Sequence, residues 1–528
     1  MDNSFGRARR NFIKGTGAAI AGSVLVAGFG QAFAQGTTTR LKVALTPPST
    51  QTTLGFQTEN SGTGPLQPMF EMLVARDRLT GELGPMLADS WTMAEDGLSW
   101  TFKLRQGVTF HDGSPFVAAD VVFSWEQNTS EESRVSTANV FRKITAVEVV
   151  SDSEVILRLE SPEIELPYFL TQAFLIYSKA YWDKVGLEGY RQQPVGTGPF
   201  KFKEFREGEF ILYERVEDHW RQTPEFAELQ LFYMPEDTTR LAALLTGEVH
   251  IAEIPRSVQN QAMARGKEIA RSTGTPALVA ARFGGNNVKE SGEAPSGPLT
   301  DPKVREAMNI AVNREEINEQ FFAGRGEVAI VDSYRAADAA FDPSWQPYVF
   351  DPERAKALLA EAGYADGFDF DMTVVNPPGF PEIPSVVEAM AIYFTNIGLR
   401  PHLVQTEVAD QNKLQRARDL NNTLFSNRQS VKPLFQAMEY FWTKGIYGFF
   451  EDAYLDEQVN RMQASLDVAE RDQIIKEIGA HLHEVHSSIP LLYIYAEVAT
   501  DPSVVAEYTA DIGAYGASVG HEYTKAAS

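Results

Sequence analysis

The chain has no cysteine among its 528 residues, which excludes disulfides, thiolate metal ligands and cysteine nucleophiles. It is also short of positive charge, because 47 Lys and Arg residues face 71 Asp and Glu residues and the net charge is −24. Nucleic acids and anionic membrane surfaces bind clustered basic residues, so this balance argues against both as partners. Hydrophobic residues make up 43% of the chain. A chain of this length is expected to bury them in two or three subdomains.

Long apolar runs are also missing, with one exception near the N-terminus. Arg9-Arg10 and then Phe12-Ile13-Lys14 precede an apolar run rich in Ala and Gly over about residues 18–29. Ala32-Phe33-Ala34 follows, with the small-x-small pattern that signal peptidase accepts. The run is shorter than the roughly 18 to 20 residues that span a bilayer. This order predicts a cleavable twin-arginine signal peptide over residues 1–34 and export to the periplasm, with a permanent N-terminal anchor as the alternative.

The remaining sequence mixes short strands with capped amphipathic helices. Alternating apolar residues predict strands over 41–45, 100–104 and 155–159 and a hairpin over 200–213. Asp301 and Asp351 each precede a proline and an apolar face of helical period, and Gly363 follows the second helix as its C-terminal signal. Residues 289–298, rich in Gly, Ser, Pro and Glu, predict a loop that crosses between domains. Without a regular βα period, the pattern indicates an α/β protein of several lobes.

Four segments carry a resemblance to a known family. The first holds Leu87-Ala88-Asp89-Ser90-Trp91, Trp100-Thr101-Phe102, Phe110-His111-Asp112-Gly113 and Ala119-Asp120-Val121; the second is Pro194-Val195-Gly196-Thr197-Gly198-Pro199-Phe200; the third holds Lys303-Val304-Arg305 and Ala311-Val312-Asn313-Arg314; the fourth holds Asp351-Pro352 and Glu361-Ala362-Gly363-Tyr364. In this order they resemble the solute-binding proteins of peptide/nickel-class ABC importers, bacterial extracellular solute-binding protein family 5.

The resemblance implies an α/β, two-lobed periplasmic-binding-protein type II fold with an extra domain inserted in the first lobe. Lobe I would comprise residues 36–78, 205–284 and 496–528, the extra domain 79–204, and lobe II 285–495. It implies a receptor, monomeric and not an enzyme, that captures a small organic solute between its lobes. The solute would be peptide-like, sugar-like or anionic, and the receptor would deliver it to a membrane permease driven by an ATPase.

One segment departs from the pattern of the peptide-binding members. They typically carry a Gly-Trp and a nearby Asp that pairs with the peptide's amino terminus, where this sequence has Asn427-Arg428. A buried amine needs a carboxylate, whereas the forked donors of Arg428 suit a carboxylate, phosphate or sugar oxygen. The departure argues against a free peptide as ligand. A role for Arg428 at the surface or between the lobes is the alternative.

Other candidate contacts are less specific. The resemblance implies that the turn at Thr197 lies near the cleft, and the aromatic run at 440–442 either walls a pocket or packs in the core. The candidate ligand-binding residues are Asn60, Thr197, Asn427, Arg428, Tyr440 and Trp442.

Signals for metal binding and catalysis are weak. His481, His483 and His486 do not share one helical face and miss the His-Glu-x-x-His spacing, so a solvated or capping role is expected for them. His111 is expected to be structural. We therefore predict no cofactor, no metal site and no enzymatic activity. An exported metal-binding protein or enzyme, and a binding protein that reports to a chemoreceptor, are the alternatives.

Overall fold

The computed structural model describes residues 40–77, 80–135, 137–272, 276–287, 296–377, 380–419, 421–429, 433–510 and 516–528. The predicted signal peptide, residues 1–34, lies outside them and stays a prediction, as does most of the predicted loop at 289–298. Within the described residues, the longest and most apolar helices still fall short of what a membrane span requires.

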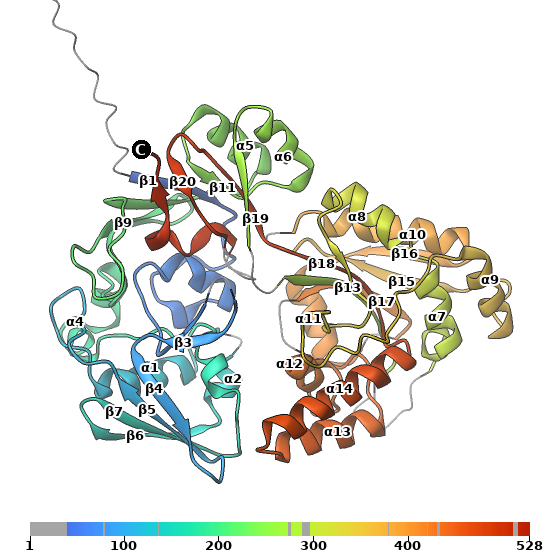
Figure 1. Ribbon diagram of the computed structural model, residues 1–528, viewed down its shortest axis with the longest axis horizontal. Helices are drawn as coiled ribbons and strands as arrows, with labels where there is room; N and C mark the ends of the chain where they lie inside the picture. The colour runs from blue at the N-terminus through green and yellow to red at the C-terminus, as the bar shows by residue number, and fades with distance from the viewer. Residues whose placement is uncertain are drawn as a thin grey trace, which may run out of the picture. The chain divides into compact units, whose positions relative to one another are not determined.

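The first sheet has the strand order β12-β19-β11-β1-β10-β9-β8. Its strands β9, β1, β11 and β19 are labelled in Figure 1. Its centre is β1 (Arg40–Leu45), the strand expected at 41–45, which pairs in parallel with β10 and β11. The expected hairpin at 200–213 is confirmed as β8 and β9, which pair antiparallel. The other bounds are β8 (Phe200–Arg206), β9 (Phe210–Arg215), β10 (Glu228–Tyr233), β11 (Ile251–Ala252), β12 (Glu268–Arg271) and β19 (Glu497–Thr500). We call the part built on this sheet lobe I.

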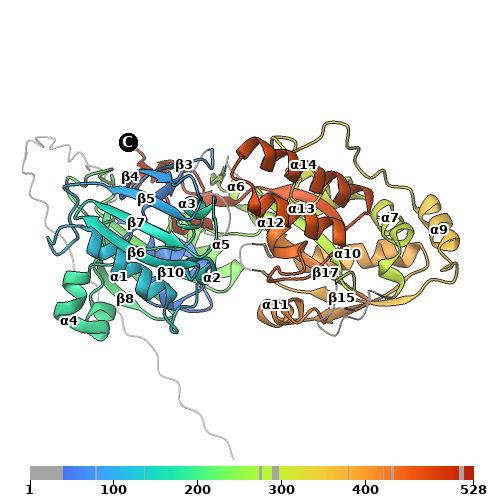
Figure 2. The same cartoon turned by 90° about the horizontal axis from the view of Figure 1, so that it is seen from below.

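The second sheet has the order β14-β18-β13-β17-β15-β16, and we call the part built on it lobe II. Every residue of β13 and β18 is buried, so these strands form the middle of its core. Helices α12, α13 and α14 pack together beside this sheet (Figure 2). The strand bounds are β13 (Ala277–Phe283), β14 (Glu327–Val328), β15 (Asp369–Val374), β16 (Arg400–Gln405), β17 (Thr423–Gln429) and β18 (Ser488–Ile494). The helix bounds are α12 (Pro433–Tyr440), α13 (Ala453–Ala464) and α14 (Val468–Glu484).

A smaller antiparallel sheet lies between β1 and β8 in the sequence. Its order is β4 (Ala88–Met93), β5 (Ser99–Leu104), β7 (Glu154–Leu159) and β6 (Ile144–Ser151), and α1 (Ala118–Thr129) packs on it. The strands expected at 100–104 and 155–159 are thus confirmed as β5 and β7. Their inward residues, such as Phe102 and Leu157, are fully buried. This sheet is the insertion within lobe I that the fold class requires.

Helices α7 (Pro302–Ile310) and α9 (Pro352–Glu361) begin where the Asp-Pro pairs predict. The Asp301 carboxylate accepts a hydrogen bond from the Lys303 backbone N–H, and Asp351 accepts one from Arg354. Gly363 follows α9 with φ of 88°, a backbone conformation that glycine adopts without strain. Both helices bury their apolar face in lobe II.

The chain crosses between the two large sheets twice, from β12 to β13 and from β18 to β19. Strand β13 pairs in the second sheet, so the first crossing comes before Ala277, earlier than the crossing expected near residue 284. The second lies at Tyr495 and Ala496. Two lobes joined by two crossings and carrying an insertion in the first are the type II periplasmic-binding-protein fold.

Candidate functional site

A cavity of about 860 Å³ lies at the carboxyl ends of the parallel strands of both sheets. One wall follows β1, β10 and β11 in lobe I, at residues 45–49, 235–240 and 253–259. The other follows β15 and β16 in lobe II, at residues 376–382 and 407–412. Open α/β sheets bind ligands at this edge, because the loops that leave the strands there can meet a solute. We call this cavity the interlobe cleft.

The lining of the interlobe cleft combines apolar and acidic side chains. Leu45, Ile254 and Phe380 give it apolar surface of the kind that holds organic ligands. Carboxylates outnumber cationic groups within the described lining. The acidic members are Glu59, Glu236, Asp237, Glu253, Glu382, Glu407 and Glu497, and the basic members are Arg240 and Arg256.

Both arginines of the lining are engaged by the protein itself. The guanidinium of Arg240 donates to the backbone carbonyl groups of Met234, Pro235 and Glu253 and pairs with Asp237. It is only 3% exposed. An arginine held by several carbonyl groups stabilises the loops around it and has few N–H groups left for a solute.

Arg256 connects the two lobes at the floor of the cleft. It begins α6 (Arg256–Met263) in lobe I, and its guanidinium lies 3.4 Å from Glu382 in lobe II and 3.1 Å from Glu497 of β19. Arg325 of lobe II pairs with the other side of Glu497 at 2.8 Å. Burial opposes ionisation of Glu497, but these arginines outweigh it and keep its pKa below the usual value. The four groups balance in charge.

Two carboxylates of the lining are positioned without a cation among the described residues. The Glu253 carboxylate accepts hydrogen bonds from the backbone N–H groups of Thr46 (2.9 Å) and Ala517 (3.0 Å). On the opposite wall, Glu407 is exposed and precedes α11 (Val408–Arg416). Neither forms an ion pair within the described part of the chain. Each therefore presents negative charge to the cleft.

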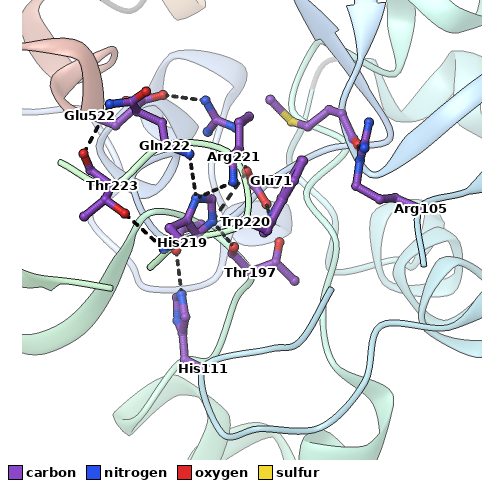
Figure 3. A network of polar contacts seen from close by, with 12 residues as sticks. Glu71, Arg105, His111, Thr197, His219, Trp220, Arg221, Gln222, Thr223 and Glu522 are labelled. Carbon is purple, nitrogen blue, oxygen red and sulfur yellow. Dashed lines mark hydrogen bonds and ion pairs between the residues drawn. The ribbon is translucent and has the colours of Figure 1, made fainter. Parts of the chain in front are cut away.

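A separate network of buried polar contacts lies in lobe I (Figure 3). The Glu71 carboxylate is 1% exposed and accepts hydrogen bonds from Arg221 (3.0 Å) and from the indole of Trp220 (3.1 Å). Arg221 also pairs with Glu522 at 3.2 Å, which ties the C-terminal segment to this network. Arg221 thus supplies the cation that the buried Glu71 needs, as the cost of burying charge requires, and shares it with Glu522.

Two neutral histidines hold the turn at Gly196-Thr197-Gly198 beside this network. His111 accepts from the Gly196 N–H at Nδ1 (3.3 Å), and its Nε2 contacts the Gly198 carbonyl oxygen (2.9 Å). Removal from water lowers the pKa of His111 to about 4, although its bond to Gly198 opposes the change. His219 bonds the Thr197 carbonyl oxygen at 2.8 Å, and burial lowers its pKa too. The expectation that His111 is structural agrees with these contacts.

The turn is also closely packed against the chain. A Cβ atom on Gly196 would lie 2.1 Å from the Met69 carbonyl oxygen, and one on Gly198 would lie 2.6 Å from the Pro68 oxygen. Both positions therefore require glycine. The two glycines allow this turn to pack directly against the backbone of residues 68 and 69.

Comparison with known proteins places the chain in a family. Residues 82–449 match the model of the bacterial extracellular solute-binding proteins, family 5. The chain belongs to this family. It is 29% identical to the heme-binding protein A of Haemophilus influenzae over 384 residues, which cover 68% of each chain. It is 26% identical to the glutathione-binding protein GsiB of Salmonella typhi over 422 residues, 77% of this chain and 80% of the relative.

A solved structure supports the fold. The periplasmic binding protein DppA of Helicobacter pylori, in complex with the peptide STSA, is similar with a TM-score of 0.72 and 21% identity, over 90% of this chain and 96% of that one. The names of these relatives point to heme, glutathione and a peptide. They therefore do not select one ligand class for this family-5 protein.

The predicted ligand contacts are dispersed in the structure. Thr197 is 1% exposed in the turn described above, and its hydroxyl group has no hydrogen-bond partner among the described residues. Tyr440 is 8% exposed and lies over the buried Arg282 at 4.6 Å, while Trp442 is partly buried against the same core. These three lie outside the described lining of the interlobe cleft. Their role as contacts stays a prediction.

The other predicted contacts belong to elements whose side chains are only partly described. Asn60 begins a 3-10 helix next to Glu59, which lines the cleft, but its own side chain lies outside the described residues. The backbone of Asn427 and Arg428 runs in β17 opposite Ala280 and Val279. Strand β17 is parallel to β15, so these residues lie toward the edge of the sheet that holds the cleft. Their side chains also lie outside the described residues.

The three clustered histidines of the family-5 protein have separate partners. His481 bonds Asp452 at 2.7 Å, His483 stacks on Trp345, and His486 bonds the Tyr348 hydroxyl at 2.8 Å. Across the described ranges, His, Asp and Glu side chains do not gather in threes as metal ligands do.

Sequence reasoning did not identify Glu253 and Glu382. Glu253 is held by Ala517, which lies 264 positions further along the chain. Glu382 pairs with Arg256 across 126 positions. A motif or a periodic pattern is local, so it carries no signal for either contact.

Proposed function

We propose that this protein is the extracytoplasmic receptor of an ABC importer, which captures a small organic solute in the interlobe cleft and delivers it to a permease and its ATPase. The observation that carries the proposal is the position of the cleft. It lies between the strand ends of two lobes joined by two crossings, with apolar and charged side chains from both walls. Such a site brings the lobes together when a solute contacts both of them.

We also propose how the protein is exported and in which form it acts. The twin-arginine signal peptide would take the folded chain to the periplasm, and the mature chain would act there as a monomer without a cofactor. The lobe boundaries at residues 78, 204 and 495 belong to the same proposal. So do the ligand contacts Asn60, Thr197, Asn427, Arg428, Tyr440 and Trp442. A closed receptor would then present a new surface to the permease.

A solute screen followed by scattering tests the function. A ligand that binds only the folded state adds about 2.7 kcal/mol to its stability at a ligand concentration of 100 Kd. The melting temperature rises as a result. We expect at least one solute of a broad library to raise the melting temperature of residues 35–528 and to reduce the radius of gyration in small-angle X-ray scattering. If no solute raises it, or if the best solute leaves the radius unchanged, the receptor function fails.

A further inference from the structure

The acidic side chains of the interlobe cleft exceed what its own cations balance. Arg256 and Arg325 balance Glu382 and Glu497, and Arg240 balances Asp237. Three further carboxylates of the described lining, Glu236, Glu253 and Glu407, form no ion pair within the described part of the chain. A solute enters a site that already carries several uncompensated negative charges.

The partial positive charges of the helix N-termini at the cleft do not cancel the negative charge of its lining. Helices α5 (Asp237–Thr246), α6, α10 (Ile383–Asn396) and α11 begin at the lining, and each N-terminus is equivalent to about half a positive charge. Such ends bind anions when nothing else occupies them. Here Glu236, Glu382 and Glu407 precede α5, α10 and α11, and Glu382 also accepts a hydrogen bond from the first N–H group of α6. An anionic solute would meet these carboxylates first.

Glu253 is the carboxylate best placed to meet a cation. It lies just after β11 and is not the N-cap residue of α6, which is Pro255. Both of its oxygens are fixed by backbone N–H groups, which set its orientation without neutralising it. The side chain is half-buried, so solvent screens it less than a surface group.

A second, independent acceptor lies on the opposite wall. Glu382 is 8% exposed, and its Oε1 atom accepts from Arg256 at 3.1 Å. Its Oε2 atom is buried without a hydrogen-bond partner among the described residues. A buried carboxylate oxygen without a donor is costly, and a donor from a bound solute would satisfy it.

We propose, on the basis of the receptor function above, that the solute carries a positive charge as a protonated amine or guanidinium group, and that Glu253 is its counter-ion. Glu382 accepts a further hydrogen bond from the other lobe, so the solute joins both walls. Of the peptide-like, sugar-like and anionic classes that the sequence indicates, a positive charge excludes the anionic class and neutral sugars.

Probes of defined charge test this proposal. Putrescine, agmatine and choline represent organic cations, succinate and citrate anions, glucose and ribose neutral solutes, and calcium and nickel chloride metal ions. At matched ionic strength, we expect one or more organic cations to raise the melting temperature most. A larger shift with any other group, or no shift with the organic cations, overturns the charge assignment. A shift with anions or sugars would still leave the receptor function intact, so the two failures are distinguishable.

Variants distinguish binding at Glu253 from a non-specific attraction of cations to an acidic protein. With the best cation, we expect Glu253→Gln to raise Kd at least about tenfold, as the loss of a charge-assisted hydrogen bond does. Glu407→Gln removes an exposed charge and should raise Kd about two- to fivefold. The matched control is Glu353→Gln in α9, with a side chain 81% exposed and outside the cleft lining, and it should leave Kd within about twofold. Equal Kd values in all three variants overturn the proposal. If Glu253→Gln does not fold, an unchanged Kd in Glu407→Gln does so.

Discussion

Two carboxylates of lobe I, Glu71 and Glu253, differ in the groups that hold them. In the buried network, Glu71 is 1% exposed and has Arg221 and Trp220 as donors. In the interlobe cleft, Glu253 is half-buried and is held by two backbone N–H groups. The first arrangement stabilises the fold because the charge of Arg221 offsets that of the buried Glu71. The second keeps its charge available because its donors are neutral. The partners of a carboxylate, more than its burial, therefore distinguish a structural group from a binding group.

The largest expected effect concerns Glu71. Glu71→Gln leaves Arg221 with one carboxylate fewer in a buried site, and we expect the free energy of unfolding to fall by about 3 kcal/mol. Glu253→Gln, which loses no ion pair, should cost less than about 1.5 kcal/mol. Urea unfolding followed by tryptophan fluorescence measures both. Equal losses in the two variants would remove the distinction between the regions.

The pH dependence of His111 gives the next effect. Because its folded pKa, about 4, lies below the unfolded value of 6.5, the unfolded chain binds the extra proton first. Stability is therefore full above pH 6.5 and is lost as pH falls toward 4. We expect wild type to lose about 2 kcal/mol relative to His111→Gln between pH 7 and pH 5. If the free energy of unfolding depends on pH in the same way in both proteins, the lowered pKa of His111 is contradicted.

The pair between Arg256 and Glu382 should have a smaller effect on stability. Glu382→Gln keeps the shape of the side chain, and Arg256 retains Glu497, so we expect a loss of about 1 kcal/mol. Because the pair joins the lobes, the variant without solute should also have a larger radius of gyration in scattering. An unchanged radius would mean that the pair does not restrain opening.

The smallest effect is expected at Arg428, if the solute is a cation. Arg428→Ala should then leave the Kd of the cation within about threefold, because the variant removes no attractive charge. An anionic or hydroxyl-rich solute held by Arg428 would instead lose more than about 1.5 kcal/mol of binding free energy. Titration calorimetry of this variant thus decides between the two electrostatic accounts of the cleft.

Local signals predicted the secondary structure and the family, because those signals act within a few residues. Asp301 and Asp351 cap the helices they precede, and the hairpin of β8 and β9 forms where its alternation indicates. The cleft could not be predicted in the same way. Glu253 meets Ala517, and Arg256 meets Glu382, through the assembly of distant segments. Thr197 lies in a motif that proves to be a tightly packed turn, so a recognisable sequence does not by itself mark a ligand contact.

A crystal structure of the mature chain with the solute that most raises its melting temperature would show where that solute binds. We expect density for it in the interlobe cleft, between Thr46 and Glu253 on one wall and Phe380 and Glu382 on the other. A second groove, lined by Gln51, Arg191 and Phe202 in lobe I, has a volume of about 550 Å³. Density in that groove, with the interlobe cleft empty, would contradict the account.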